Sequence, residues 1–188
     1  FPSTPPERPS RPRPTLGHFG AMYGARNPRE LWPVLAHAGW DLLLAGPVTE
    51  EVLEDLRRAH VSFTVLGDLP HKDAVKNMLE CEALLISHNN SESAKSSTPG
   101  KFFECLAAGR PLLVVGPENS DLQDRCVDEG LAFFVHGEPT FEQGVRSWLQ
   151  VTQNEVGHGV RPQKNASKFE RRLLTAELGG LLNATLGR

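Results

Sequence analysis

The sequence predicts an α/β protein with a doubly wound, parallel, six-stranded sheet, helices on both of its faces and a long helix at the C-terminus. Two observations carry this prediction. Apolar runs of strand length alternate along the chain with segments of helical pattern, six times over. Several runs, such as Asp41–Ala45 (DLLLA) and Ala83–Ser87 (ALLIS), are apolar throughout, which is typical of parallel strands covered on both faces. The pattern is that of a Rossmann-like fold, whose six strands usually lie in the order 3-2-1-4-5-6.

The chain divides into an arm and one domain. Residues 1–14 contain six prolines, which excludes a helix or a central strand and indicates a linker or an extended arm. Residues 15–188 are enough for one domain with a sizeable core. Because the chain starts at Phe1 rather than at Met, we expect it to be part of a longer protein.

Composition excludes several classes of protein and of site. The 20 Lys and Arg residues face 23 Asp and Glu residues, so we expect no nucleic-acid partner. Cys81, Cys105 and Cys126 are widely spaced in apolar contexts and predict reduced, buried thiols of a cytoplasmic protein. Neither the cysteines nor the histidines have the spacing of a metal site. No run approaches the roughly 18 apolar residues of a membrane span.

In the first half of the chain, helix signals separate three strands. The expected strands are 16–22, 41–45 and 61–66. Asn27 is expected to cap a helix that runs to about His37 and is ended by Gly39. Thr49 is expected to cap the next helix, because two glutamates follow it and two arginines occupy the last turn, which matches the helix dipole.

The second half repeats the alternation around a long polar loop at 88–98. The expected strands are 83–87, 112–115 and 131–135. Besides the helix that starts near Gly100, four helices are expected. They are 71–80, 140–151, a long last helix at 166–186, and a helix that is capped by Asn119 or Ser120 and ends at about 129. We expect Trp148 and Leu149 on the apolar side of the helix at 140–151.

The stretch from Ser96 to Pro111 (SSTPGKFFECLAAGRP) carries the strongest functional signal. It predicts a loop of small residues, a helix N-terminus near Gly100 and then a buried strand. Such an N-terminus offers free N–H groups and the positive end of a dipole to a phosphate, and Lys101 adds a charge there. Glu104, one turn further, could accept hydrogen bonds from sugar hydroxyls. Alternatively, Lys101 and Glu104 form a solvated pair on an ordinary helix.

Topology places this stretch at a predicted binding site. In doubly wound sheets, ligands bind beyond the carboxyl ends of the strands, at the switch point between strands 1 and 4. The loops that meet there are 21–27, 88–100 and, next to them, 67–72. The first of these loops contains a cation, Arg26.

Three segments resemble the C-terminal, nucleotide-sugar-binding domain of GT-B glycosyltransferases related to bacterial polysaccharide and lipid-linked sugar transferases. The most specific is 98–111 (TPGKFFECLAAGRP), which is similar to the donor-site helix "PxKxxEyLAaGkP". The segments 18–26 (HFGAMYGAR) and 65–71 (VLGDLPH) are similar to the glycine loop after the first strand and to the turn beside the base. The resemblance extends over about 16–186.

The resemblance implies roles for individual residues. Glu104 would hold the donor ribose hydroxyls, and Arg26 would pair with the phosphates. Lys101 would bind phosphate or the sugar. Leu69 and His71 would contact the base. The small residues before the helix would approach the diphosphate through their backbone; they are Ser97, Thr98, Pro99 and Gly100. Gly20, in the glycine loop after the first strand, would also belong to the nucleotide-sugar site.

Two positions depart from the pattern of the family. Ser96 stands where many relatives place a glutamate that contacts the transferred sugar, and Ala21 stands where many place an arginine. These departures leave the identity of the sugar open.

The resemblance implies the donor-binding half of a glycosyltransferase, which moves a sugar from a nucleotide diphosphate to an acceptor hydroxyl without a metal or another cofactor. A missing N-terminal half would bind the acceptor and supply the catalytic base, so no catalytic residue is assigned here. The expected location is cytoplasmic, with peripheral membrane association open to the full-length enzyme. Two alternatives remain: a non-catalytic Rossmann-like binding or scaffold module, and one half of a nucleotide-sugar epimerase.

Overall fold

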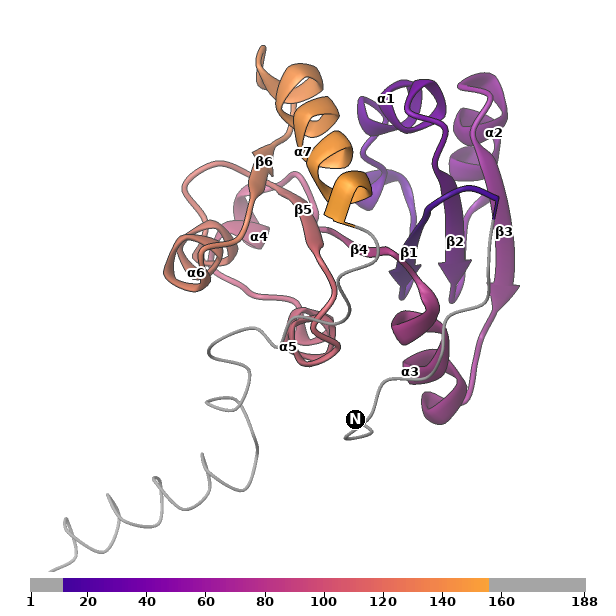
Figure 1. Ribbon diagram of the computed structural model, residues 1–188. Coiled ribbons are helices and arrows are strands. Elements are labelled where there is room, and N and C mark those ends of the chain that lie inside the picture. Colours follow the sequence, from indigo (N-terminus) through magenta and orange to yellow (C-terminus); the bar gives the residue numbers. More distant parts are fainter. Residues whose placement is uncertain (1–11, 156–188) are drawn as a thin grey trace, which may run out of the picture.

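The computed structural model describes residues 12–155 (Figure 1). Most of the predicted arm at 1–14 and the predicted long helix at 166–186 lie outside the described residues. The last described element is the helix α7 (Phe141–Glu155), which confirms and extends the helix expected at 140–151.

The strands form one six-stranded, all-parallel sheet in the order β3-β2-β1-β4-β5-β6, as predicted. The strands are β1 (Thr15–Phe19), β2 (Asp41–Ala45), β3 (Ser62–Gly67), β4 (Ala83–Ser87), β5 (Leu112–Gly116) and β6 (Phe133–Val135). Because β1 lies between β2 and β4, the chain reverses its direction of winding at β1 and β4. Their carboxyl ends therefore form the switch point.

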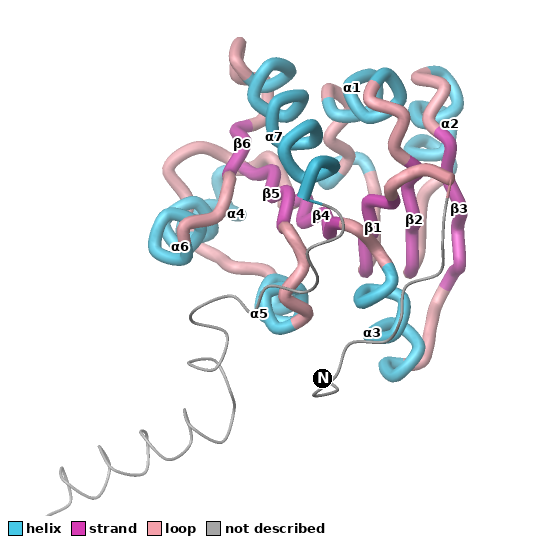
Figure 2. Tube along the Cα trace, viewed as in Figure 1, coloured by secondary structure: helices cyan, strands magenta, loops and turns pink. Residues whose placement is uncertain are grey.

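Helices cover both faces of the sheet (Figures 1 and 2). The helices are η1 (Gly24–Arg26, a 3₁₀ turn), α1 (Leu31–His37), α2 (Glu50–Arg58), α3 (His71–Glu80), α4 (Glu92–Lys95), α5 (Gly100–Ala107), α6 (Asp121–Glu129) and α7. In the view that both figures share, α1, α2 and α7 lie above the sheet, while α3 and α5 lie below it. The predicted doubly wound architecture is thus confirmed.

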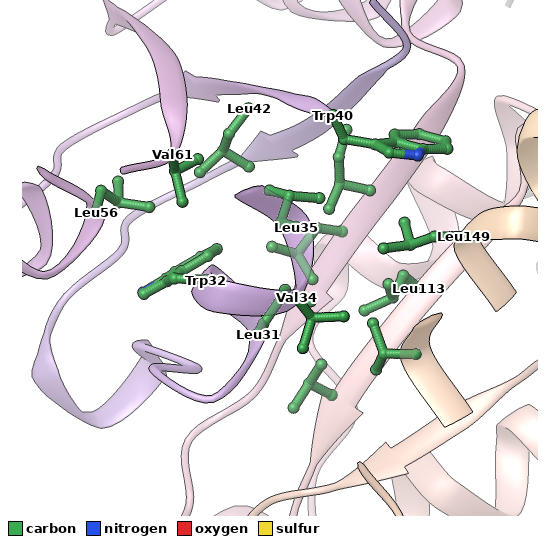
Figure 3. Packing of buried hydrophobic residues seen from close by; sticks show 14 of the residues in the cluster. Leu31, Trp32, Val34, Leu35, Trp40, Leu42, Leu56, Val61, Leu113 and Leu149 are labelled. Atoms are coloured by element: carbon green, nitrogen blue, oxygen red, sulfur yellow. The ribbon is translucent and has the colours of Figure 1, made fainter. Parts of the chain in front are cut away.

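Alternate residues of the central strands supply two separate cores. On β2, Leu42 and Leu44 join one core, and Leu43 and Ala45 join the other. The first core lies beneath α1, α2 and α7, and Figure 3 shows Leu35, Leu113 and Leu149 pointing toward one another within it. The second is completed by α3, α5 and α6. Burial on both faces explains why these strands are apolar throughout.

The first strand is shorter than predicted. β1 ends at Phe19 rather than at Met22, because Gly20 has φ +147° and its N–H donates to the Ala45 carbonyl at 2.7 Å. Met22 instead makes an isolated parallel bridge with Val48.

The predicted start of the following helix is wrong. Asn27 is extended (φ −88°, ψ 101°), and α1 begins four residues later at Leu31. The amide of Asn27 is used elsewhere: it donates to Asp55 Oδ2 and accepts from Trp32 Nε1, both at 2.7 Å. Its side chain is therefore not available to cap a helix.

The second half contains two further differences. The polar loop at 88–98 includes the short helix α4, which the sequence did not predict. The last strand is β6, Phe133–Val135, instead of 131–135. By contrast, Thr49 and Ser120 occupy the N-cap positions of α2 and α6, as expected. The Ser120 hydroxyl accepts from the Gln123 N–H, whereas the Thr49 side chain makes no capping hydrogen bond.

Candidate functional site

A pocket of about 260 Å³ opens where the switch point was predicted. It is lined by the ends of β1 and β4, by η1 and by the start of α5. The lining residues are His18, Phe19, Gly20, Arg26, Ile86, Ser87, Pro99, Gly100 and Lys101. Five of the residues predicted as site residues, Gly20, Arg26, Pro99, Gly100 and Lys101, are therefore brought together.

The N-terminus of α5 forms one wall of this pocket. Pro99 is the N-cap residue, and it has no side chain that could accept from the first turn. The space beside Gly100 is open, since a Cβ atom there would meet no other atom within 4 Å. The wall thus presents uncapped backbone N–H groups and the positive end of the helix dipole.

Arg26 also lines this pocket. Its Nε donates to Asn89 Oδ1 at 2.9 Å, and its guanidinium lies over the ring of Tyr23, with 5.2 Å between Cζ and the ring centroid. Its own carbonyl accepts from Ser87 Oγ at 2.8 Å. The loop after β1 is therefore bound to the loop after β4 across the switch point.

Lys101 and Glu104 form an ion pair, with 2.8 Å between Nζ and Oε2. Both side chains are about one-third exposed, and His71 Nε2 lies 3.6 Å from the same carboxylate oxygen. This is the Lys–Glu pair that the sequence left as an alternative to ligand contacts. Since the pair is partly solvated, it is weakly held.

A second pocket of about 170 Å³ adjoins the first. The two share Phe19, Gly20 and Lys101 in their linings. Leu69, predicted beside the base, lines this second pocket together with Asp68. His71, the other residue predicted there, has a side chain that is 76% exposed and approaches Glu104 instead.

The small residues before α5 are not all at the pocket wall. Ser97 Oγ lies 3.1 Å from both His88 Nε2 and the Ala94 carbonyl. Its hydroxyl is therefore used inside the loop after β4. Thr98 is half-buried between Ser97 and the N-cap.

His18 is a buried histidine at the pocket. Its Nδ1 is 3.1 Å from the Leu85 carbonyl, while Nε2 makes no hydrogen bond of normal geometry. Burial lowers the pKa of His18 to about 4, against the effect of the nearby carbonyls of Leu85 and Ala21. The ring is therefore neutral near pH 7, and the positive charge at the pocket comes from Arg26 and Lys101.

A partly buried hydrogen-bond network joins the loop after β4 to β6 and to the residue before α1. His136, at the end of β6, lies 2.9 Å from Glu30 Oε1 through Nδ1 and 3.1 Å from the His88 carbonyl through Nε2. Although burial raises it, the pKa of Glu30 is held below its usual range by the hydrogen bond from His136. Sequence reasoning missed this network and Asn89, since their members lie far apart in the chain and follow no periodicity.

None of the three cysteines forms a disulfide, and all three are buried, as expected. Burial raises the pKa of both Cys105 and Cys126 to about 12, so these thiols are inert. Within 12–155, no group of three or more His, Cys, Asp or Glu side chains could hold a metal ion. In the same range, no helix is both long and apolar enough to cross a membrane.

Comparison with solved structures defines the class of fold. The sequence matches no protein-family model, and no curated protein is significantly similar to it. HepE from Anabaena, solved with UDP and glucose, aligns with a TM-score of 0.67 and 14% identity over 92% of this chain and 48% of HepE. The catalytic domain of cholesterol-α-glucosyltransferase from Helicobacter pylori aligns with a TM-score of 0.62 and 16% identity, over 82% of this chain and 95% of that domain.

A third structure narrows the comparison to one half of such enzymes. It is the C-terminal domain of a glycosyl transferase group 1 family protein, LpcC from Francisella tularensis, with a TM-score of 0.58, 13% identity and coverage of 88% and 86%. These neighbours are glycosyltransferases of the GT-B type. The chain therefore has the Rossmann-like fold of the C-terminal domains of GT-B glycosyltransferases, and it spans about half the length of HepE.

Proposed function

We propose that this chain is the donor-binding half of a glycosyltransferase and binds a nucleotide-diphosphate sugar. The observation that carries the proposal is the pocket between the N-terminus of α5, Arg26 and Lys101. Uncapped helical N–H groups, a guanidinium and an ammonium line the same pocket. Together they suit an anion with several oxygens, such as a diphosphate. HepE, a neighbour of the same fold, was solved with UDP and glucose, with UDP, and with UDP-glucose.

The two adjoining pockets suggest how such a donor would lie. The diphosphate would occupy the pocket at α5, and the nucleoside would extend past Gly20 toward Asp68 and Leu69. Glu104 would leave Lys101 and accept hydrogen bonds from the ribose hydroxyls. Breaking this partly exposed ion pair costs little, about 1 kcal/mol or less.

The contribution of this half to the reaction would be electrostatic. When the bond from the sugar to the diphosphate breaks, negative charge grows on the leaving phosphate oxygen. The dipole of α5, Arg26 and Lys101 would stabilise that charge without a metal ion. A second domain would bind the acceptor hydroxyl and supply the base. The reaction would belong to the synthesis of polysaccharides or lipid-linked sugars in the cytoplasm.

The test is calorimetric titration of the chain with UDP, GDP and ADP, beside a Glu104→Ala variant. We expect one nucleotide to bind with a Kd in the millimolar range or tighter. Loss of the ribose contacts in Glu104→Ala should weaken binding about tenfold to a hundredfold, since hydrogen bonds to a charged group are worth about 1.5–3 kcal/mol. A matched control is Glu142→Ala, which removes an exposed glutamate from α7 and should leave affinity unchanged.

If none of the three nucleotides binds to the wild-type chain, the proposed function is wrong for this chain. A scaffold module with the same fold would give that result. If a nucleotide binds equally well to wild type and Glu104→Ala, the pocket is right and the ribose assignment is wrong.

A further inference from the structure

Two arginines three residues apart in the loop after β1 have opposite electrostatic surroundings. Arg29 pairs with two carboxylates, those of Glu51 and Asp55. Arg26 forms no ion pair with any residue that the structure describes, and the side chain that accepts from it is the neutral amide of Asn89. The positive charge of Arg29 is therefore compensated within the fold, and that of Arg26 is not.

The guanidinium of Arg26 is nevertheless held in place. Nε donates to Asn89 Oδ1 at 2.9 Å, and the plane of Tyr23 lies beneath it. The Tyr23 hydroxyl donates to the same Asn89 oxygen, at a longer 3.4 Å. The backbone next to Asn89 is also held, because the N–H of Asn90 donates to the Ala25 carbonyl at 3.1 Å. Only Nε is used in these contacts, so the terminal nitrogens remain available to a ligand.

We infer that Asn89, supported by the ring of Tyr23, is a positioning residue that holds the uncompensated charge of Arg26 toward the diphosphate. The inference rests on the proposed function. An arginine loses rotamer freedom when it binds an anion, and an arginine already fixed by Asn89 and Tyr23 loses less of it on binding. A neutral amide is suited to this task, since an aspartate would fix the guanidinium equally well but would cancel its charge.

The variants separate two effects of the residue at position 89: holding the Arg26 guanidinium in place and neutralising its charge. Asn89→Asp keeps an oxygen acceptor for Nε in a side chain of the same shape, and Asn89→Ala removes the acceptor. We expect Asn89→Asp to bind about tenfold more weakly than wild type, although its thermal stability is equal or higher. We expect Asn89→Ala to bind about threefold to tenfold more weakly. A residue with a purely structural role would lose affinity only where stability falls.

The experiment is titration of the full chain with UDP, GDP and ADP and with the matching nucleosides uridine, guanosine and adenosine. The losses should occur with the diphosphates and not with the nucleosides, because Arg26 lines the pocket in which the proposed function places the diphosphate. Combining Arg26→Ala with Asn89→Ala should weaken binding no further than Arg26→Ala alone. Tyr23→Phe keeps the ring and should bind almost as wild type, whereas Tyr23→Leu should bind more weakly.

The outcomes separate the two proposals. If wild type binds a diphosphate and Glu104→Ala weakens it, but Asn89→Asp binds as wild type does, the positioning role is wrong and the donor site stands. If the effects of Arg26→Ala and Asn89→Ala simply add, the role is also wrong. If no diphosphate binds to wild type, the proposed function fails, and this inference fails with it.

Discussion

At the scale of single residues, His18 makes the stability of the domain depend on pH. Burial lowers its pKa from 6.5 to about 4, and the charges of Arg26 and Lys101 act in the same direction. Between these two values the unfolded chain binds a proton that the folded chain does not. The free energy of unfolding therefore rises with pH across this window and falls as the pH drops toward 4.

We predict that His18→Asn flattens this dependence. The asparagine keeps a side-chain donor near the Leu85 carbonyl but does not titrate, so up to about 3 kcal/mol of pH-dependent free energy should disappear. Urea unfolding at several pH values from about 4 to 7 measures the slope. Burial also lowers the pKa of His88, so a shallower slope should remain. An unchanged slope in the variant would contradict the assignment.

Residues differ in how far their surroundings can be predicted from sequence. Arg26, Lys101 and Gly100 could be assigned to one site because parallel strands end at the same edge of the sheet. Their partners could not be predicted: Asn89 lies 63 positions from Arg26, and His136 lies 106 positions from Glu30. Such contacts depend on loop conformations, which leave no periodic pattern in the sequence.

At the scale of elements, two glycines allow the ends of β1 and β2 to meet beside the site. Gly46 follows β2 with φ +121°, and a Cβ atom on it would lie 2.6 Å from the carbonyl oxygen of Gly20. Gly20 lines both pockets. The absence of a side chain at Gly46 is therefore required both by the backbone conformation and by the close approach of the neighbouring strand end.

We predict that Gly46→Ala destabilises the domain by about 2–4 kcal/mol and weakens nucleotide binding, since Gly20 must move. The matched control is Gly39→Ala. Gly39 also has a positive φ, +72°, but a Cβ atom there would meet nothing within 4 Å. The control should cost only about 1 kcal/mol and leave binding unchanged. Equal losses in thermal and calorimetric measurements of the two variants would contradict this explanation.

Among the elements, those with a strong local signal were predicted well. β2, β4 and α3 have the bounds that were expected from their apolar runs and flanking turns. The start of α1 was not predictable, because Asn27 has cap chemistry but bonds to Asp55 and Trp32. α4 has only four residues and is too short for a helical period to be visible.

At the scale of the whole molecule, the sheet separates two cores that share its strands. Leu149 of α7 is 1% exposed in the first core, and Leu122 of α6 is fully buried in the second. Each core lies on one face of the sheet, but neither has strands of its own, because alternate residues of the same strands supply both. We therefore expect one cooperative unfolding transition rather than two.

This arrangement gives a quantitative prediction. Leu149→Ala and Leu122→Ala should each lower the free energy of unfolding by about 2–5 kcal/mol, because each leaves a cavity in a packed core. Val151→Ala, on the same helix as Leu149 but 58% exposed, should change it by less than about 0.5 kcal/mol. Since the sheet lies between the two leucines, their effects should add to within about 0.5 kcal/mol in the double variant.

Urea unfolding, followed by circular dichroism and by tryptophan fluorescence, measures the free energies of unfolding and the number of transitions. Trp32 and Trp40 report on the first core. Fluorescence and circular dichroism transitions that separate in Leu122→Ala would show that the two cores unfold independently, whatever their common strands.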